Sequence, residues 1–518
     1  MSTQAVTEGL AFPVDPRVEV DSDKDDTLGR KNAIASVATA ALDKSAPRAA
    51  PEKSMFSTFS ESFTWGVSSV VKSFSSVFKK EFPFDKLITR AEQLFKDRKS
   101  IQAERLVDKD LKGFCKDHLK GPYVNDASSQ ALFQKLRKVI LDIEYRTSPE
   151  EILKVKTELC HRVVQNFTEM QEEILTRASR DFQKPDFMTK FGIAEGDSIA
   201  SIELLGDETH NHGRIPARIR FASGAEVIYK PRSMHVEHTL YNSESGVCTG
   251  AGLGSYHVMC EDDELGEYGY SEFLHNTEEA NTFSTPEELS EYYQKLSKLE
   301  SIAQELGITD LHLMNVIVKD KIPYIIDAEV YLNPTQIDLP FQTSLFCQKF
   351  GVAFNFDLGM PDGSTRGNNR LWFTKELGSK FKYPKRNLTE EELKKAGVDF
   401  TDIRTLTSLT EAEQEICKNA KSSLAERPGR FVPVSTKVLK DSLNYINPHS
   451  KKSISDFIVS QIKPDLALYG FKIIVPHEHF AELLEEDYLN HDVPTFTFDS
   501  RRNVVLCKGQ VIAGIPRK

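Results

Sequence analysis

The pattern of hydrophobic and polar residues changes character twice before residue 200. Residues 1–53 show little hydrophobic periodicity and are rich in Ala, Ser, Asp, Lys and Pro, which predicts a disordered N-terminus. In residues 54–84, aromatic residues and valines recur at mostly three- to four-residue steps, which predicts an amphipathic helix. The pattern is then helical throughout residues 85–190, with long charged segments. We expect this helical region to cover or orient the part of the chain that follows.

Two interpretations of the helix at 54–84 stay open. Docking on the body of the protein is the more ordinary one, because apolar side chains at helical spacing usually pack in a core. Lys72, Lys79 and Lys80 lie near the aromatic residues, and this arrangement also suits a helix that contacts a membrane surface or a partner.

Strands and turns are predicted beyond residue 195. Residues 198–232 contain three apolar segments, separated by a polar turn and by a hairpin turn at Gly224, and YGYSEFLH at 268–275 adds a further strand. A helix follows in PEELSEYYQKLSKLESIAQELG, with Thr285 or Ser284 as its N-cap and Gly307 at its C-terminal end.

The last elements are a short hairpin and a long mixed region. The segments NVIVK and IPYIID predict two strands that flank a turn at 319–322. The remainder, to residue 518, predicts a mixed and mainly helical structure. A chain of 518 residues is too long for one small core, so we expect two or three packed units of the α+β class.

Composition narrows the class of protein. The net charge of -11 argues against a nucleic-acid binder whose affinity comes from neutralising phosphates. The seven cysteines are scattered and form no C-x-x-C pair, which favours a reducing compartment. No apolar run is long enough to cross a bilayer and no signal-peptide pattern begins the chain. We therefore expect a cytoplasmic protein in the producing cell, with secretion by a route without a cleaved signal as the alternative.

Four polar residues stand in the order used by kinase-type phosphotransferases. Lys230 ends a strand, Asp310 and Asn315 bound a polar loop, and Asp327 ends the strand IID. In such enzymes a strand Lys pairs with the phosphates of ATP, a catalytic loop holds an Asp and an Asn, and a strand-end Asp binds Mg²⁺. Asp310 is suited to accept the proton of an attacking hydroxyl.

The spacing in TDLHLMNVIV is D-x-H-x-x-N, which adds His312 to the loop. It resembles the catalytic loop of lipid kinases more than the H-R-D order of protein kinases. By itself the spacing is weak, because Asn and Asp capping a turn would explain it equally well. Together with YKPR upstream and IIDAE downstream it predicts a two-lobed kinase-like fold with a helical N-terminal extension.

The motifs also resemble a particular family, the dehydratase domain of class II lanthipeptide synthetases. The resemblance lies in GDETHNHGR, VIYKPRS, EYGYSEF, TDLHLMNVIV, PYIIDAEVYLNP, GRFVPVSTKVL and NHDVPTFTFDSRRNVVLCKGQVI, scattered over roughly residues 195–518. It implies a kinase-like fold related to lipid kinases that binds ATP and Mg²⁺. It further implies an enzyme that phosphorylates Ser or Thr of a peptide and then eliminates phosphate, leaving dehydroalanine or dehydrobutyrine.

The resemblance assigns roles to individual residues. By it, the catalytic residues are Asp310, His312, Lys230, His210, Arg430 and Thr436. The residues that bind ATP are Lys230, Asp207, Glu208, Arg232 and Glu272, and the Mg²⁺ ligands are Asn315, Asp327 and Glu329. Arg430 and Thr436 match the positions with which the family binds and expels phosphate; a surface ion pair and a helix N-cap are the ordinary alternatives for these two.

Departures from the family concern elimination more than phosphorylation. Where the family usually has Asp two residues before its His, this chain has Glu208 before His210, with Asp207 one residue further back. Val434 stands where the family usually has another Arg. A Ser/Thr protein kinase of the same fold without elimination is therefore one alternative, and a nucleotide-binding pseudoenzyme that scaffolds partners is another.

The resemblance also sets the expected boundaries and partners. We expect a kinase-like N-lobe with a phosphate-covering turn at 191–280 and a C-lobe with the elimination elements at 281–518. The family's synthetases normally continue into a zinc-dependent cyclase, whereas this chain stops at Lys518, so ring closure is expected to need a separate cyclase. The substrate is a peptide or protein bearing Ser or Thr, in natural-product biosynthesis or as the host target of a secreted bacterial effector.

Overall fold

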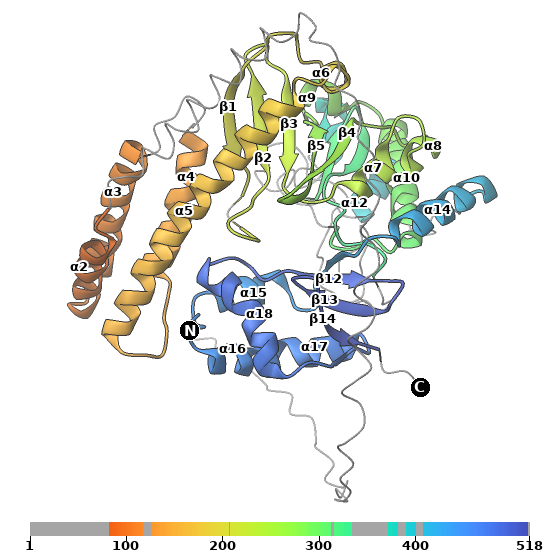
Figure 1. Cartoon of the computed structure of the whole chain (residues 1–518). Helices are drawn as coiled ribbons and strands as arrows, with labels where there is room; N and C mark the ends of the chain where they lie inside the picture. The colour runs from red at the N-terminus through yellow and green to blue at the C-terminus, as the bar shows by residue number, and fades with distance from the viewer. Residues whose placement is uncertain are drawn as a thin grey trace, which may run out of the picture. The chain divides into compact units, whose positions relative to one another are not determined.

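Residues 82–118, 126–206, 208–311, 315–333, 371–381, 390–399 and 408–515 are described by a computed structural model (Figure 1). All of them belong to one compact unit, residues 62–518. Helices combine with mainly antiparallel sheets, which places the protein in the α+β class as expected. The disordered segment predicted at 1–53 and nearly all of the helix predicted at 54–84 lie outside the described residues, as do Asp207 and His312.

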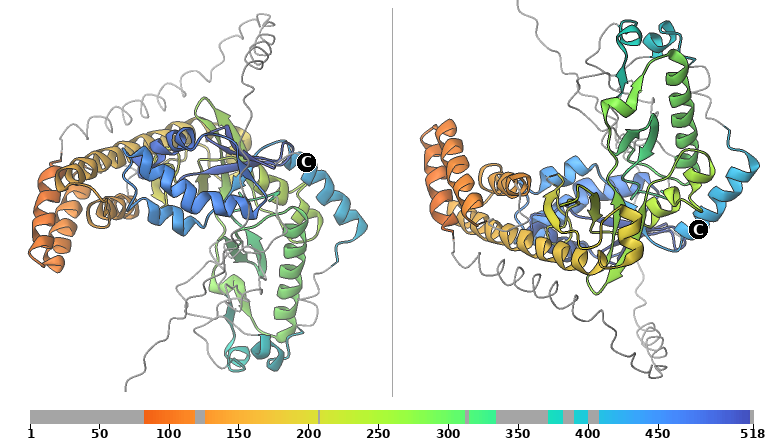
Figure 2. Two further views of the ribbon diagram at one scale, coloured as in Figure 1. Left: turned by 90° about the horizontal axis from the view of Figure 1, so that it is seen from below. Right: turned by 90° about the horizontal axis from the view of Figure 1, so that it is seen from above.

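Helices occupy the segment predicted to be helical at 85–190. They are α2 (Phe84–Lys96), α3 (Ser100–His118), α4 (Asp126–Leu141), α5 (Pro149–Asp181) and α6 (Pro185–Phe191). Helix α5 begins where the Ser148 side chain accepts a hydrogen bond from the backbone N–H of Glu151, with Pro149 in the first turn. Helices α2 and α3 lie beside α4 and α5 in both views (Figure 2).

The first sheet is antiparallel, in the order β1-β2-β3-β5-β4. Its strands are β1 (Ile199–Leu204), β2 (Ala217–Phe221), β3 (Glu226–Lys230), β4 (Val258–Asp263) and β5 (Gly266–Glu272). The predicted hairpin at Gly224 is confirmed, with φ +95° at that glycine, whereas β4 was not predicted. Side chains alternate between the two faces of a strand. Val227 and Tyr229 accordingly pack in one core with α5, and Lys230 lies on the other face.

A second core follows the first sheet. It contains α7 (His235–Tyr241), α8 (Val247–Gly250), α9 (Glu278–Asn281), α10 (Pro286–Glu305), β6 (Thr282–Phe283), β7 (Val316–Lys319), β8 (Ile322–Ile325), β9 (Trp372–Phe373), α11 (Lys375–Gly378), α12 (Glu390–Lys395) and α14 (Glu411–Leu424). Thr285, one of the two predicted residues, caps α10 by accepting a hydrogen bond from the N–H of Glu288. The hairpin predicted around 319–322 is confirmed as β7 and β8.

The C-terminal region has a third core and a second sheet. Its helices are α15 (Thr436–Ser442), α16 (Lys451–Phe457), the π-helix η1 (Ile458–Ile462), α17 (Lys463–Leu468) and α18 (His477–Leu489). Its strands β10 (Gly429–Phe431), β11 (Lys472–Ile473), β12 (Phe496–Asp499), β13 (Val504–Cys507) and β14 (Gln510–Gly514) form a sheet in the order β10-β12-β13-β14-β11. The region is mainly helical as predicted, but its sheet was not anticipated.

None of the helices within the described ranges is both long enough and apolar enough to span a membrane.

Candidate active site: a charged cluster around Lys230

Lys230 lies at the end of β3, and its ammonium group is enclosed by carboxylates. Its Nζ is 2.9 Å from Oδ1 of Asp327 and 3.3 Å from Oε1 of Glu237, and the residue is only 6% exposed. A buried ammonium is unfavourable unless it is paired and hydrogen-bonded. The position of Lys230 therefore depends on Glu237 of the nearby helix α7 and on Asp327, which follows β8 and lies 97 positions away in the chain.

Arg232 extends this cluster toward Glu329. Its guanidinium lies 2.6 Å from Oε1 of Glu237, donates to Asp327, and places Nε 3.2 Å from Oε2 of Glu329. A planar guanidinium presents several N–H donors in fixed directions and can engage several carboxylates at once. Lys230 and Arg232, expected to bind ATP, thus contact Asp327 directly, and Arg232 also contacts Glu329.

Glu237 is a central residue that the sequence analysis missed. It is fully buried, and Lys230 and Arg232 lower its pKa against the opposing effect of burial. In protein kinases the strand Lys pairs with a Glu of a nearby helix. The signal available in the sequence was therefore a carboxylate at the start of the helix that follows Lys230.

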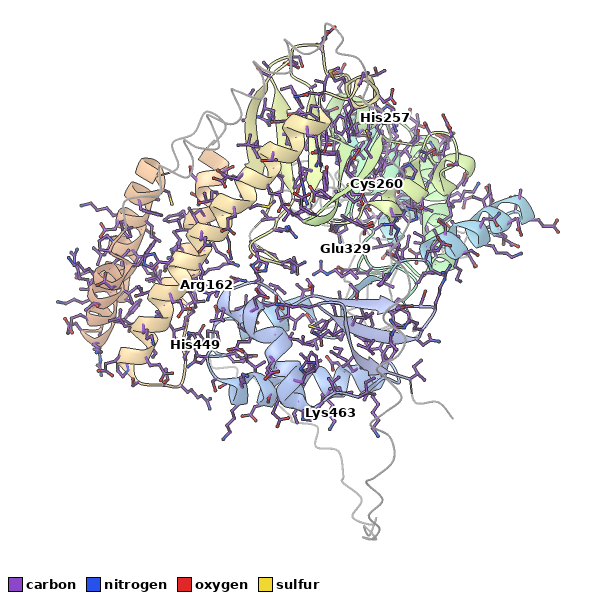
Figure 3. All side chains as sticks on the ribbon, viewed as in Figure 1. Arg162, His257, Cys260, Glu329, His449 and Lys463 are labelled. Carbon is purple, nitrogen blue, oxygen red and sulfur yellow. The ribbon has the colours of Figure 1, made fainter. Side chains whose placement is uncertain are left out.

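Arg430 joins the C-terminal region to the cluster. Its guanidinium donates to the Glu329 carboxylate, and its backbone N–H donates to the Glu329 carbonyl at 3.0 Å. Its second terminal nitrogen is 3.6 Å from Oε1 of Glu208 and 3.5 Å from Nε2 of His210. In Figure 3, Glu329 is labelled between the first sheet and the C-terminal elements. Arg430 is thus paired within the cluster and is not part of a simple surface ion pair.

His210 presents one nitrogen to the cluster and the other to the backbone. Nδ1 lies 2.8 Å from the Val493 carbonyl, which can only accept, so Nδ1 carries a proton. Nε2 lies 3.1 Å from Oε1 of Glu208. Burial opposes ionisation of Glu208, but the hydrogen bond and charge of His210, with the charge of Arg430, lower its pKa. Nε2 is therefore the nitrogen that faces Glu208 and Arg430.

Asp310 is a buried carboxyl with a raised pKa. Burial raises the pKa of Asp310 to about 7; the charge of Arg430 opposes this shift, and the carboxylates Glu329 and Asp327 add to it. Its backbone is left-handed, with φ +62°, and the Asn315 amide donates to its carbonyl at 2.8 Å. A carboxyl with a pKa near the working pH is suited to general base chemistry.

Two expected site residues have other surroundings. Glu272, at the end of β5, pairs with Lys319 at 2.5 Å. Thr436 is the first residue of α15, whose N-cap is Ser435. The same helix acts on the cluster through Lys440, whose charge helps to lower the pKa of Glu208.

The donor atoms suit a magnesium ion bound together with phosphate. Oδ1 of Asp327 accepts from Lys230 and Arg232, while the hydrogen bonds recorded for the described residues leave its Oδ2 and the Asn315 side-chain oxygen free. Within the described ranges, no group of three or more His, Cys, Asp or Glu side chains is arranged to hold a metal ion. Mg²⁺ is commonly held by one or two carboxylates plus substrate phosphates, so Asp327 and Asn315 fit such a site.

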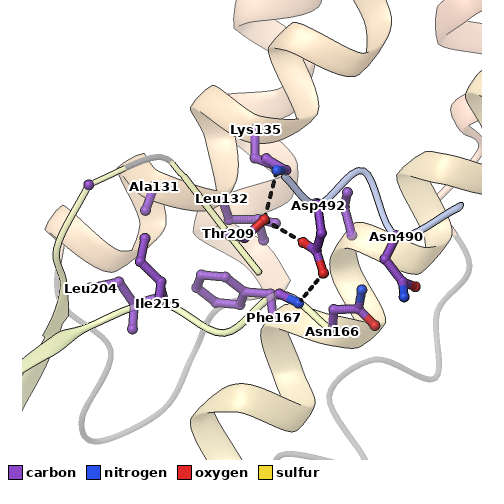
Figure 4. Close-up of a pocket in the computed structure, with 13 residues that line it drawn as sticks. Ala131, Leu132, Lys135, Asn166, Phe167, Leu204, Thr209, Ile215, Asn490 and Asp492 are labelled. Carbon is purple, nitrogen blue, oxygen red and sulfur yellow. Dashed lines mark hydrogen bonds between the residues drawn. The ribbon is translucent and has the colours of Figure 1, made fainter. Parts of the chain in front are cut away.

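A cavity of about 30 Å³ lies behind the loop that carries His210 (Figure 4). Its lining residues come from α4, α5, the end of β1, the loop itself and the segment before β12: Ala131, Leu132, Lys135, Val163, Asn166, Phe167, Leu204, Gly206, Thr209, Gly213, Ile215, Asn490 and Asp492. Pockets for ligands of drug size begin at roughly 300 Å³. We therefore do not assign this cavity to a nucleotide.

Comparisons with known proteins found similarity over part of the chain. Residues 155–350 match a family model described as a domain of unknown function, DUF4135. The chain is also 30% identical over 173 residues to the lacticin 481/lactococcin biosynthesis protein LcnDR2 of Lactococcus lactis subsp. lactis. That stretch covers 31% of this chain and 18% of the relative. Both matches support the resemblance to lanthipeptide synthetases that the motifs indicated.

Proposed function

We propose that this chain is a lanthipeptide-dehydratase-like enzyme that uses ATP and Mg²⁺ to phosphorylate Ser or Thr of a peptide or protein and then eliminates the phosphate. The observation that carries the proposal is one connected cluster of ion pairs. In this cluster Lys230, Asp327 and Glu329, from the kinase-like motifs, meet Arg430 and the His210 loop, from the motifs tied to elimination.

Phosphorylation uses the charged groups at the end of β3. Mg²⁺–ATP supplies the phosphoryl group when it is bound. Lys230 and Arg232 compensate negative charge on the phosphates, and Asp327 with Asn315 supplies oxygen ligands for the metal. Asp310 accepts the proton of the substrate hydroxyl, because its pKa of about 7 balances proton affinity against the fraction ionised at neutral pH.

Elimination uses the part of the cluster that contains Arg430 and His210. A basic group of the site removes the α-proton, the electrons of that C–H bond form the Cα=Cβ double bond, and the Cβ–O bond to phosphate breaks. Arg430 binds the departing phosphate through two nitrogens, which a planar guanidinium does well. His210 can donate a proton from Nε2, and Thr436 is assigned to the same step by resemblance.

Mass spectrometry of Ser- and Thr-containing peptides, incubated with the full chain, ATP and Mg²⁺, tests this proposal. Loss of the mass of one water supports both steps, because phosphorylation followed by elimination removes the side-chain oxygen. Lys230→Met should abolish the change, whereas Tyr229→Phe, altered on the other face of the same strand, should keep it. An unmodified peptide pool, with no Mg²⁺-dependent ATP turnover, would instead support a pseudoenzyme.

A Ser/Thr kinase without elimination is the second candidate. Val434, at the position where the family usually has an Arg, is 2% exposed and packs in the third core, so it offers phosphate no charge. A stable gain of one phosphoryl group, with no later loss, would favour this candidate.

A further inference from the structure

A buried carboxylate clamps the loop that carries Glu208 and His210. Asp492, in the segment between α18 and β12, is 1% exposed. Its Oδ1 accepts from the Thr209 hydroxyl at 2.5 Å and its Oδ2 accepts from the Gly213 N–H at 2.9 Å (Figure 4). The two oxygens therefore accept hydrogen bonds from both ends of the turn around His210, Thr209 and Gly213.

A lysine of α4 sets the direction of this hydrogen-bond chain. Nζ of Lys135 donates to Oγ1 of Thr209 at 2.8 Å and to the His491 carbonyl. Because the Thr209 hydroxyl accepts from an ammonium, its own proton is directed at Asp492. Lys135 of α4 thus contacts the turn through the Thr209 hydroxyl.

The backbone on either side of Asp492 completes the clamp. The N–H of Val493 donates to the Thr209 carbonyl at 2.9 Å, and the Val493 carbonyl accepts from Nδ1 of His210 at 2.8 Å. These contacts direct Nε2 of His210 toward Glu208 and Arg430.

The turn needs such external support. Asn211, His212 and Gly213 have φ of +45°, +67° and +75°, three consecutive left-handed residues of which two carry side chains. Residues with a Cβ rarely adopt this conformation, and it persists only where surrounding contacts hold it. A Cβ on Gly213 would also lie 2.8 Å from Cβ of Asn166.

We propose that Asp492 is a positioning residue for the reaction: held through Thr209 and Lys135, it sets how Glu208 and His210 face Arg430. The effect on catalysis rests on the proposed function, whereas the effect on the orientation of His210 does not. If Asp492 had only a structural role, its substitution would change the stability of the protein but leave the environment of the His210 ring unaltered in the folded state.

Asp492→Asn in the full chain tests this assignment. The Asn side chain has one acceptor oxygen in place of two, so it can keep the hydrogen bond from either the Thr209 hydroxyl or the Gly213 N–H. The turn should therefore lose one of these two hydrogen bonds and change conformation. The nitrogen-15 signal of His210, identified by its loss in His210→Gln, should shift or split in the folded variant. Peptide elimination should slow about 10- to 100-fold, as found when supporting partners of site residues are removed, while phosphorylation stays near the original rate.

Asp487→Asn is the matched control. Asp487 is also buried, lies five residues earlier, and pairs with Lys508 at 3.2 Å instead of with the turn. It should leave the His210 signal and the ratio of elimination to phosphorylation unchanged.

Each outcome decides the assignment. An unchanged His210 signal in folded Asp492→Asn overturns it, as does an equal effect of Asp487→Asn. If Asp492→Asn does not fold, Thr209→Val, which removes only the bridging hydroxyl at similar volume, should give the same shift of the signal, and no shift overturns the proposal. If the unaltered enzyme modifies no peptide, the proposed function fails, and the His210 signal alone decides whether Asp492 positions the ring.

Discussion

Consecutive residues of β3 place their side chains in two different charged networks. Behind the first sheet, the Tyr229 hydroxyl lies 2.7 Å from Arg177 and 2.8 Å from Glu173, both of α5. Arg177 is 2% exposed and also pairs with Asp263 at 2.6 Å. On the other face Lys230 pairs with residues around the proposed site.

The two networks differ in their balance of charge. Behind the sheet, four cations (Arg177, Arg180, Lys184 and Arg214) pair with four carboxylates (Glu173, Asp181, Glu261 and Asp263). In the Lys230 cluster, three Lys or Arg cations (Lys230, Arg232 and Arg430) pair with four carboxylates (Glu208, Glu237, Asp327 and Glu329), and His210 also pairs with Glu208.

The exposure of particular carboxylates differs between the networks, although Arg180 and Lys184 behind the sheet are themselves 47% and 42% exposed. The Asp327 side chain is 35% exposed, whereas Glu173 and Asp263 behind the sheet are each 9% exposed. The network behind the sheet is balanced by the protein alone, so we expect its loss to reduce stability. The Lys230 cluster contains the partly exposed Asp327 carboxylate and lies at the proposed site, so we expect its loss to reduce activity.

We predict the largest effect on activity for substitution of Asp310, a buried carboxyl that lies outside the ion pairs of the Lys230 cluster. Asp310→Asn should slow phosphorylation by about 100-fold or more, because general base catalysis contributes about 10²- to 10⁴-fold. In the unaltered enzyme the rate should rise with pH through about 7, since the base acts when deprotonated. The variant should lose this dependence. Initial rates of phosphoryl transfer between pH 5.5 and about 8.5 measure both effects.

A flat pH profile in the unaltered enzyme would contradict this role for Asp310, provided that ATP binding stays constant across the range.

Neighbouring substitutions on β3 test the difference between the two faces. Lys230→Met should lower phosphorylation by about 100- to 1,000-fold, the loss typical of removing one preorganised electrostatic group. Tyr229→Phe should keep most of the rate and lower the midpoint of thermal unfolding instead. Equal losses of activity in the two variants would break the distinction.

Removing one cation behind the sheet should lower the free energy of unfolding without changing the rate of the reaction per folded molecule. Arg177→Met leaves Glu173 and Asp263 without their shared partner, and breaking a buried pair costs about 3 to 5 kcal/mol. Urea denaturation measures the loss. The rate per folded molecule, taken well below the unfolding midpoint, should match that of the unaltered enzyme.

The smallest effect is predicted for an ion pair that belongs to neither network. In α12, Lys395 pairs with Glu391 at 2.6 Å, with their side chains 69% and 77% exposed. Lys395→Ala should change the free energy of unfolding by less than about 0.5 kcal/mol, because solvent screens exposed pairs. A loss as large as that of Arg177→Met would show that burial does not govern these networks.

Local signals in the sequence predicted much of the fold. The hairpin at Gly224, the Thr285 cap of α10 and the hairpin of β7 and β8 depend on residues close together in the chain. The second sheet was missed because its strands are two to five residues long, and because β10 and β11 pair with strands distant in the chain, although β12, β13 and β14 pair with their sequence neighbours. Short strands carry too few alternating positions to show a period of two.

The sequence by itself determined which groups capable of chemistry the chain carries and in what order, from Lys230 through Asp310 to Arg430. Only the tertiary structure decided how they are held: Glu329 against Arg430, and Asp492 behind His210. The physical reason is that burying a charge is unfavourable without a partner. The partner is chosen by proximity in space, and residues such as His210 and Val493 lie 283 positions apart in the chain.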